Sequence, residues 1–244
     1  MSDTIRTRTS NPARLTGVAY LGIIVTGVFA EFVVRGQLIA DDDPIATARN
    51  IAGSPGLFGV GIGADVVMIA LDITVAIGLF RLLRHIDRRL ALSTTVLRLV
   101  QAAVLAVNLL GLVRALDLAR GAVGGDGVVF IGPAQDVLDA VERHALGYDV
   151  GLIAFGLSCL VLGKLLRTAR LVGRPLAIGM SATGLVYLTG SFAALFAPSL
   201  TPVIEPLYLI PFVAETAFAV RLVRRGLSAP TTAVATVRPV PAAA

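Results

Sequence analysis

The sequence contains few of the residues from which metal sites and nucleic-acid interfaces are built. It has no Trp, one Cys and two His among 244 residues, and only 15% of its residues are charged. The single cysteine, Cys159, excludes an intrachain disulfide, and two distant histidines, His85 and His144, argue against a haem or zinc enzyme. Without Trp or an aromatic-interleaved basic patch, the net charge of +5 does not indicate nucleic-acid binding. The composition therefore predicts no cofactor, no metal site and no nucleic-acid partner.

Long hydrophobic runs make up most of the chain, which is 56% hydrophobic with a mean hydropathy of +0.84. About 20 apolar residues in a helix cross a hydrocarbon core about 30 Å thick. We expect six transmembrane helices, at residues 14–34, 57–80, 90–113, 146–166, 175–196 and 206–223. The predicted fold class is an all-α polytopic membrane helix bundle at 14–225, between disordered tails at 1–13 and 226–244.

The first hydrophobic run has an alternative interpretation as a cleaved signal peptide. The segment Val28–Ala30 would be an acceptable small-residue cleavage site. However, the run is long for a signal peptide, and its loss would leave an odd number of spans. We therefore favour a transmembrane helix.

Lys and Arg residues are distributed unequally between the two sides of the predicted bundle. Fifteen lie in the N-terminal segment, the loops 81–89 and 164–174 and the C-terminal segment, whereas five lie in the alternate connections. The positive-inside rule then places both termini in the cytoplasm. The sequence predicts a multi-pass protein of a plasma membrane, with the lipid bilayer as its surroundings.

Two connections on the opposite side should contain helices. Asp43 followed by Pro44 is typical of a helix start, with Asp43 as the N-cap of a short surface helix. A cation site at the acidic triplet 41–43 is the less favoured alternative. After a Gly-rich turn, Pro133 opens an amphipathic helix that we expect to continue into the fourth span.

Several stretches resemble an uncharacterised bacterial membrane family, domain-of-unknown-function family 4386. These are Ala13–Leu21, Gly27–Arg35, Ala64-Asp65 with Asp72, and Leu97–Ala103 with Asn108. The resemblance covers residues 13–225 and implies a multi-span protein of the bacterial inner membrane. It implies no activity, cofactor or catalytic residue.

Charged residues inside the expected spans fall at two depths. Asp72 and Arg98 each lie about nine residues from the basic end of their helix, so both should be about 12–14 Å deep and form an ion pair. Glu215 should lie near this level. Glu31 and Asp65 match each other at a higher level.

Polar residues on the same helix faces extend these two levels. Asp65 and Asp72 are seven residues apart and share a face, as do Gln101 and Asn108. Tyr20, Gly27 and Glu31 likewise share one stripe of the first span. Tyr187 lies in mid-span and could line a cavity, although core tyrosines are commoner. We therefore expect one polar seam per helix, facing a common centre.

The charge count suggests where a site would lie. Four acids and one Arg fall within the expected spans, so the surplus acids must be protonated, hydrated, snorkelling or bound to a cation. Glu31 can pair with Arg35, one turn away near the outer surface. Asp65 and Glu215 have no obvious partner. The candidate binding centre, with no catalytic residue and no metal ligand, comprises Glu31, Asp65, Asp72, Arg98, Gln101, Asn108, Tyr187 and Glu215.

Three functional hypotheses follow. The favoured one is a non-enzymatic membrane protein that binds or moves a small solute, lipid or proton, with Arg98 as an anchor and Asp65 and Glu215 exchanging a proton. The second is a structural or regulatory membrane protein whose buried ion pair sets helix register. The third, an intramembrane enzyme, is less favoured because the sequence shows no convincing nucleophile or metal cluster.

Overall fold

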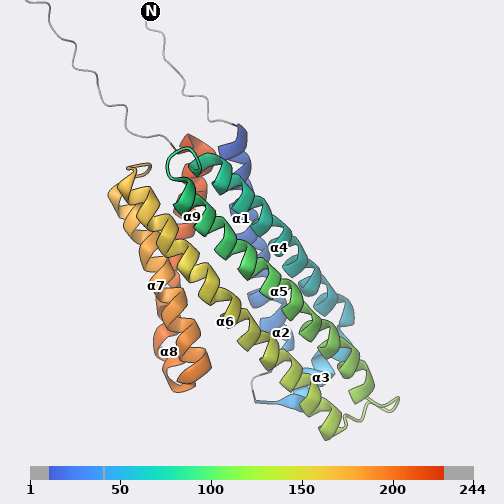
Figure 1. The fold of residues 1–244 in the computed structure, drawn as a ribbon. Helices are drawn as coiled ribbons and strands as arrows, with labels where there is room; N and C mark the ends of the chain where they lie inside the picture. The colour runs from blue at the N-terminus through green and yellow to red at the C-terminus, as the bar shows by residue number, and fades with distance from the viewer. Residues whose placement is uncertain (1–10, 41, 228–244) are drawn as a thin grey trace, which may run out of the picture.

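The computed structural model shows a bundle of long helices (Figure 1). It describes residues 11–40 and 42–227, so most of the two predicted disordered tails and residue 41 of the acidic triplet lie outside the described residues. No strand forms in the described ranges, where one isolated bridge joins Val123 to Val129. Six helical stretches are long and apolar enough to cross a membrane. The prediction of an all-α, multi-pass membrane protein with six spans is confirmed.

Several helices extend beyond the predicted apolar runs. The second to fifth spans are each one continuous helix: α4 (Pro55–Leu83), α5 (Arg88–Ala122), α6 (Ile131–Thr168) and α7 (Arg174–Phe196). With 38 residues α6 is about 57 Å long, roughly twice the thickness of a hydrocarbon core. The amphipathic segment from Pro133 is part of α6, as predicted, and the connection before it shortens from the expected 114–145 to 123–130.

The first and sixth spans are interrupted. In the first, α1 (Asn11–Val28) passes into the π-helical turn η1 (Phe29–Arg35) and then α2 (Gly36–Leu38). The sixth consists of short pieces before the long α9: η2 (Pro198–Leu200), α8 (Thr201–Ile204), η3 (Glu205–Tyr208) and α9 (Leu209–Arg225). Prolines recur through this stretch, and each removes a backbone donor, which explains why regular helix is not established until α9.

The short helix α3 (Pro44–Gly53) begins as predicted. The Asp43 carboxylate accepts a hydrogen bond of 2.9 Å from the backbone N–H of Ala46, which satisfies one of the unpaired donors of the first turn. The fully buried Ala48 and Ile51 pack into an apolar cluster with residues of α5 and α6. This helix therefore covers the ends of α5 and α6 that project past the membrane core.

The six spanning helices form a closed ring. Each of α1, α4, α5, α6 and α7 packs against the next in this order, and α9 packs against both α7 and α1. Gly17 permits the closure, because a Cβ at this position would lie 2.8 Å from the carbonyl oxygen of Ala219. The start of α1 and the end of α9 lie at one end of the bundle, together with the connections 84–87 and 169–173 (Figure 1). We call this the basic end, and its cytoplasmic location remains a prediction.

Candidate functional site

A cluster of six side chains lies inside the helix ring, with one residue from each spanning helix. We call it the central cluster. Its members are Tyr20 of α1, Asp72 of α4, Arg98 of α5, Phe155 of α6, Tyr187 of α7 and Glu215 of α9.

The predicted ion pair between Asp72 and Arg98 is present. Nη2 of Arg98 donates to Oδ1 of Asp72, and the two side chains are 1% and 7% exposed, respectively. The pair joins α4 to α5. Nε and Nη1 of Arg98 and Oδ2 of Asp72 have no hydrogen-bond partner among the described residues. The pair therefore retains unused donors and an unused acceptor in the interior.

Aromatic rings flank the Arg98 guanidinium on two sides. Its Cζ lies 4.7 Å from the ring centroid of Phe155 and 5.0 Å from that of Tyr20. A desolvated cation over an aromatic face gains about 2 kcal/mol. These rings offset part of the cost of burying the charge, so Arg98 is a firmly held cation in the centre of the bundle.

Glu215 is the other charged member of the cluster. It is 5% exposed and takes part in no ion pair within residues 11–40 and 42–227. Instead, the Tyr187 hydroxyl donates to its Oε1 at 2.7 Å and the Tyr20 hydroxyl donates to its Oε2 at 3.1 Å. Each carboxylate oxygen thus has a neutral donor, and neither has a cation.

The contacts within the central cluster close into a loop around the bundle axis. Tyr20 contacts both Arg98 and Glu215, and Tyr187 contacts Glu215 and packs on Phe155 with 5.3 Å between ring centroids. Phe155 in turn lies against Arg98. With both acids ionised the cluster carries one net negative charge, whereas a proton on Glu215 makes it neutral. The arrangement can therefore hold one proton whose presence changes the charge of the interior.

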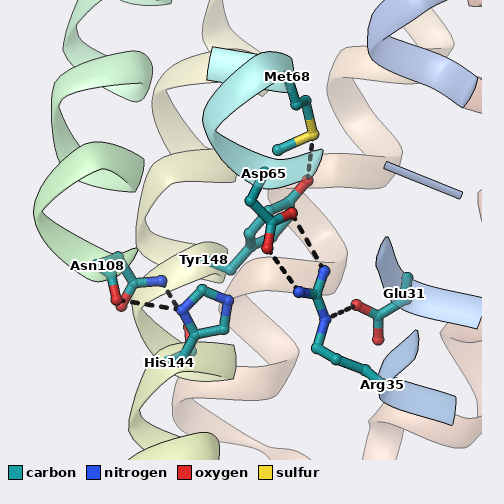
Figure 2. A network of polar contacts seen from close by, with 7 residues as sticks. All are labelled: Glu31, Arg35, Asp65, Met68, Asn108, His144 and Tyr148. Carbon is teal, nitrogen blue, oxygen red and sulfur yellow. Dashed lines mark hydrogen bonds and ion pairs between the residues drawn. The ribbon is translucent and has the colours of Figure 1, made fainter. Parts of the chain in front are cut away.

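A second polar group, which we call the outer network, is drawn in Figure 2 and comprises Glu31, Arg35, Asp65, Met68, Asn108, His144 and Tyr148. It lies further from the basic end than the central cluster, because Asp65 precedes Asp72 in α4. Here Nη1 and Nη2 of Arg35 donate to the two carboxylate oxygens of Asp65 at 2.7 and 3.5 Å, and Nε donates to Glu31 at 2.7 Å. The side chains of Arg35 and Asp65 are 10% and 3% exposed, but that of Glu31 is 60% exposed. Arg35 and Asp65 form the buried pair, which links the first span to α4, while Glu31 lies at its edge.

The same network joins α5 to α6. Nδ2 of Asn108 donates to the backbone oxygen of His144 at 2.7 Å, and Nδ1 of His144 lies 3.2 Å from the backbone oxygen of Asn108 (Figure 2). Gly147 lies against the Asn108 amide, where a Cβ would collide with it. Nearby, the Tyr148 hydroxyl lies 4.0 Å from the Met68 sulfur. These contacts join α5 to α6 and α6 to α4, and Arg35 is the cation that neutralises Asp65.

The structure corrects two expectations. Asp65 does have a dedicated partner, because Arg35 lies inside the bundle instead of at the surface. Within the described residues two arginines, Arg35 and Arg98, are therefore buried in the bundle, not one. His144, which precedes the predicted fourth span, is buried in the part of α6 that the amphipathic pattern predicted.

The remaining predicted residues are divided between the two groups. Tyr187 belongs to the central cluster and Asn108 to the outer network. Gln101 is buried on α5 near Arg98, and its Oε1 has no hydrogen-bond partner in the described part of the chain. Tyr20 lies on the predicted polar face of the first span and contacts Glu215 and Arg98, whereas the contact of Phe155 with Arg98 was not predicted from the sequence.

Two of the surface pockets in the described part of the chain lie away from these groups. One, of about 560 Å³, lies between α5 and α6 at the far end and includes Arg114, Asp117 and Asp136. The other, of about 620 Å³, lies between α6 and α7 at the basic end. Neither is lined by a member of the central cluster. Within the described residues no group of three His, Cys, Asp or Glu side chains is placed to hold a metal ion.

Comparison with known proteins identifies the family but no characterised relative. No curated protein and no solved structure matches the chain. One family profile, described as a domain of unknown function (DUF4386), matches residues 15–226, which include all members of the central cluster and the outer network. The chain therefore belongs to the DUF4386 family, as the resemblance indicated.

Proposed function

We propose that this protein is a non-enzymatic membrane protein that binds or moves a proton, alone or with a small solute, through the central cluster. The observation that carries the proposal is the environment of Glu215. It is a buried carboxyl with two tyrosine hydroxyl donors and no ion-pair partner among the described residues, beside the fixed cation Arg98.

Glu215 has hydrogen-bond partners in either charge state. As a carboxylate it accepts from Tyr20 and Tyr187. As a neutral acid it gains a donor, and either tyrosine hydroxyl can rotate to accept, because a hydroxyl is both donor and acceptor. Ionisable groups inside transmembrane segments commonly lie on proton or solute pathways. Asp65, which we first expected to share this role, is assigned to its ion pair with Arg35.

The test is proton movement into proteoliposomes. Purified wild-type protein is reconstituted with a pH-sensitive dye trapped inside, and acid is added outside, with and without each solute of a broad screen. We expect internal acidification faster than in protein-free vesicles, abolished by Glu215→Gln. Glu31→Gln is the matched control, since it removes an exposed acid of another helix and should retain the flux.

Two outcomes would contradict the proposal. One is acidification no faster than in protein-free vesicles for every solute. The other is equal acidification by wild type and Glu215→Gln, provided that both reconstitute to the same amount.

A second candidate is a structural or regulatory membrane protein. It is favoured by the positions of the two buried ion pairs, because Arg35–Asp65 links the first span to α4 and Asp72–Arg98 links α4 to α5. These pairs would then set the register of three consecutive spans. Such a protein needs no proton exchange at Glu215, so the flux experiment separates the two candidates.

A further inference from the structure

We propose that the pocket at the basic end binds a phosphate group carried by an anionic molecule. The pocket has a volume of about 620 Å³, within the usual range for small-molecule sites. It is lined by Arg167 and Thr168 of α6, Arg170 and Val172 of the connection, and Arg174 and Ala177 of α7.

The positive charge of this pocket has no counter-charge from the protein. Arg167, Arg170 and Arg174 are exposed, and none forms an ion pair with an acid in the part of the chain that the structure describes. Asp87, an acid at the same end of the bundle, caps α5 by accepting from the backbone N–H groups of Arg89 and Leu90. Three guanidinium groups around one concavity suit a phosphate, whose oxygens accept two parallel hydrogen bonds from arginine.

The base of the pocket is apolar and anchored. Val172 is 9% exposed and Ala177 is fully buried. Arg221 of α9 reaches the connection from another side, where its Nη2 lies 3.5 Å from the backbone oxygen of Leu171. The arginines therefore lie around the packed connection 169–173, between the end of α6 and the start of α7.

The position of the pocket favours a ligand at the membrane surface. It lies where two spanning helices end, on the side predicted to be cytoplasmic. Basic pockets between transmembrane helices on this side suit anionic lipid headgroups. The positive-inside rule explains exposed arginines, but it does not require three of them to share a concave surface. Connection 84–87, with Arg88 and Arg89 next to it, carries a similar charge and contributes no residue to either pocket.

A phosphate can come from a lipid headgroup or from a soluble molecule, and a binding experiment separates these sources. Purified full-length protein in detergent is titrated with phosphatidylglycerol, with the zwitterionic phosphatidylcholine, and with glycerol 3-phosphate, and binding is followed by native mass spectrometry. The test variant combines Arg167→Gln, Arg170→Asn and Arg174→Gln. Asn is used at position 170 because this residue has a left-handed backbone, with φ of 51°, which Asn tolerates.

The matched control removes three arginines from the other basic connection, as Arg84→Gln, Arg88→Gln and Arg89→Gln. Wild type and control should retain phosphatidylglycerol in preference to phosphatidylcholine, and the test variant should bind it roughly tenfold to a hundredfold more weakly. Binding of glycerol 3-phosphate with the same loss in the test variant would also support a phosphate site and assign its ligand to a soluble molecule.

The proposal is overturned if the test variant binds these anions as wild type does, or if the control loses affinity equally, because general surface charge would then explain the binding. Arg170→Asn, compared with Arg84→Gln, repeats the comparison with one charge should the triple variant fail to fold. This proposal is independent of proton movement at Glu215, which neither outcome affects.

Discussion

Replacing Asp72 by Asn should destabilise the protein by about 3–5 kcal/mol, the usual cost of leaving a buried charge without its partner. Asn preserves the size and one acceptor oxygen of Asp72 but removes the negative charge. Arg98, whose side chain is 1% exposed, would then remain cationic inside the bundle. The substitution leaves the Tyr20 and Phe155 rings beside Arg98 unchanged, so the loss reports the buried charge that has lost its partner.

A double variant tests this reasoning further. Adding Arg98→Met to Asp72→Asn removes both charges and replaces the guanidinium by an apolar chain. Because apolar replacement of a buried ion pair is often neutral, the double variant should be more stable than Asp72→Asn alone. The interaction energy between the two positions should be about 0.5–3 kcal/mol.

The assay is reversible unfolding in mixed micelles by increasing the fraction of a denaturing detergent, followed by far-UV circular dichroism. The sequence has no Trp, so tryptophan fluorescence would give no signal. Asp117→Asn is the control, because it breaks an ion pair with Arg120 in which the side chains are 70% and 59% exposed, and it should cost under about 1 kcal/mol. A loss for Asp72→Asn no greater than that of the control would refute the reasoning.

Two further predictions concern single positions. Arg35→Gln leaves Asp65, which is 3% exposed, without a cation and should lower the free energy of unfolding by about 3–5 kcal/mol in the same assay. Glu31→Gln removes an acid that is 60% exposed and should cost under about 1 kcal/mol. Equal losses would contradict the assignment of Arg35 and Asp65 as the buried pair. Gly184→Ala would place a Cβ 2.5 Å from a backbone oxygen of α6 and should lower stability by about 1–3 kcal/mol. Gly63→Ala is its control, because nothing lies within 4 Å of the added Cβ, and it should be neutral or slightly stabilising. A similar loss of stability in both variants would contradict close packing of α6 and α7 at Gly184 as the cause.

The Asp72–Arg98 pair was predictable because it depends on local geometry. The two residues lie on consecutive antiparallel helices joined by a short connection, so equal distances from that connection place them at equal depth. The same argument placed Glu215 near their level. It could not provide the partners of Glu215, because Tyr20 is 195 residues away in the sequence and the contact depends on α9 closing against α1.

The outer network was predicted less well because the first span is not a regular α-helix. The spacing of Tyr20, Gly27 and Glu31 predicts one inward face at 3.6 residues per turn. The π-helical turn Phe29–Arg35 is wider, so the helix face shifts there. Arg35 turns inward to Asp65, and Glu31 turns towards the outside.

In the fourth span the helix is longer than its hydrophobic run, as the amphipathic segment from Pro133 predicts. The fourth hydrophobic run was expected to begin at residue 146, so His144 was placed outside the span. In the structure α6 and α5 continue past the membrane core as packed helices, covered by α3. Hydropathy marks the apolar part of a helix, not its end, so the buried contact of His144 with Asn108 could not be placed from the hydrophobic run alone.

The sequence by itself determined the helical class, the six spans, the excess of basic residues at one end and the ion pair between neighbouring helices. These follow from hydropathy, from the positions of Lys and Arg, and from helix rise, all of which are local. Only the tertiary structure decided which side chains, one from each span, contact each other in the central cluster. It also decided that Arg35 neutralises Asp65 and that Glu215 accepts hydrogen bonds from two tyrosine hydroxyls and pairs with no cation in the described residues. These depend on the order of the helices in the ring and on how each is rotated, which packing between distant segments sets.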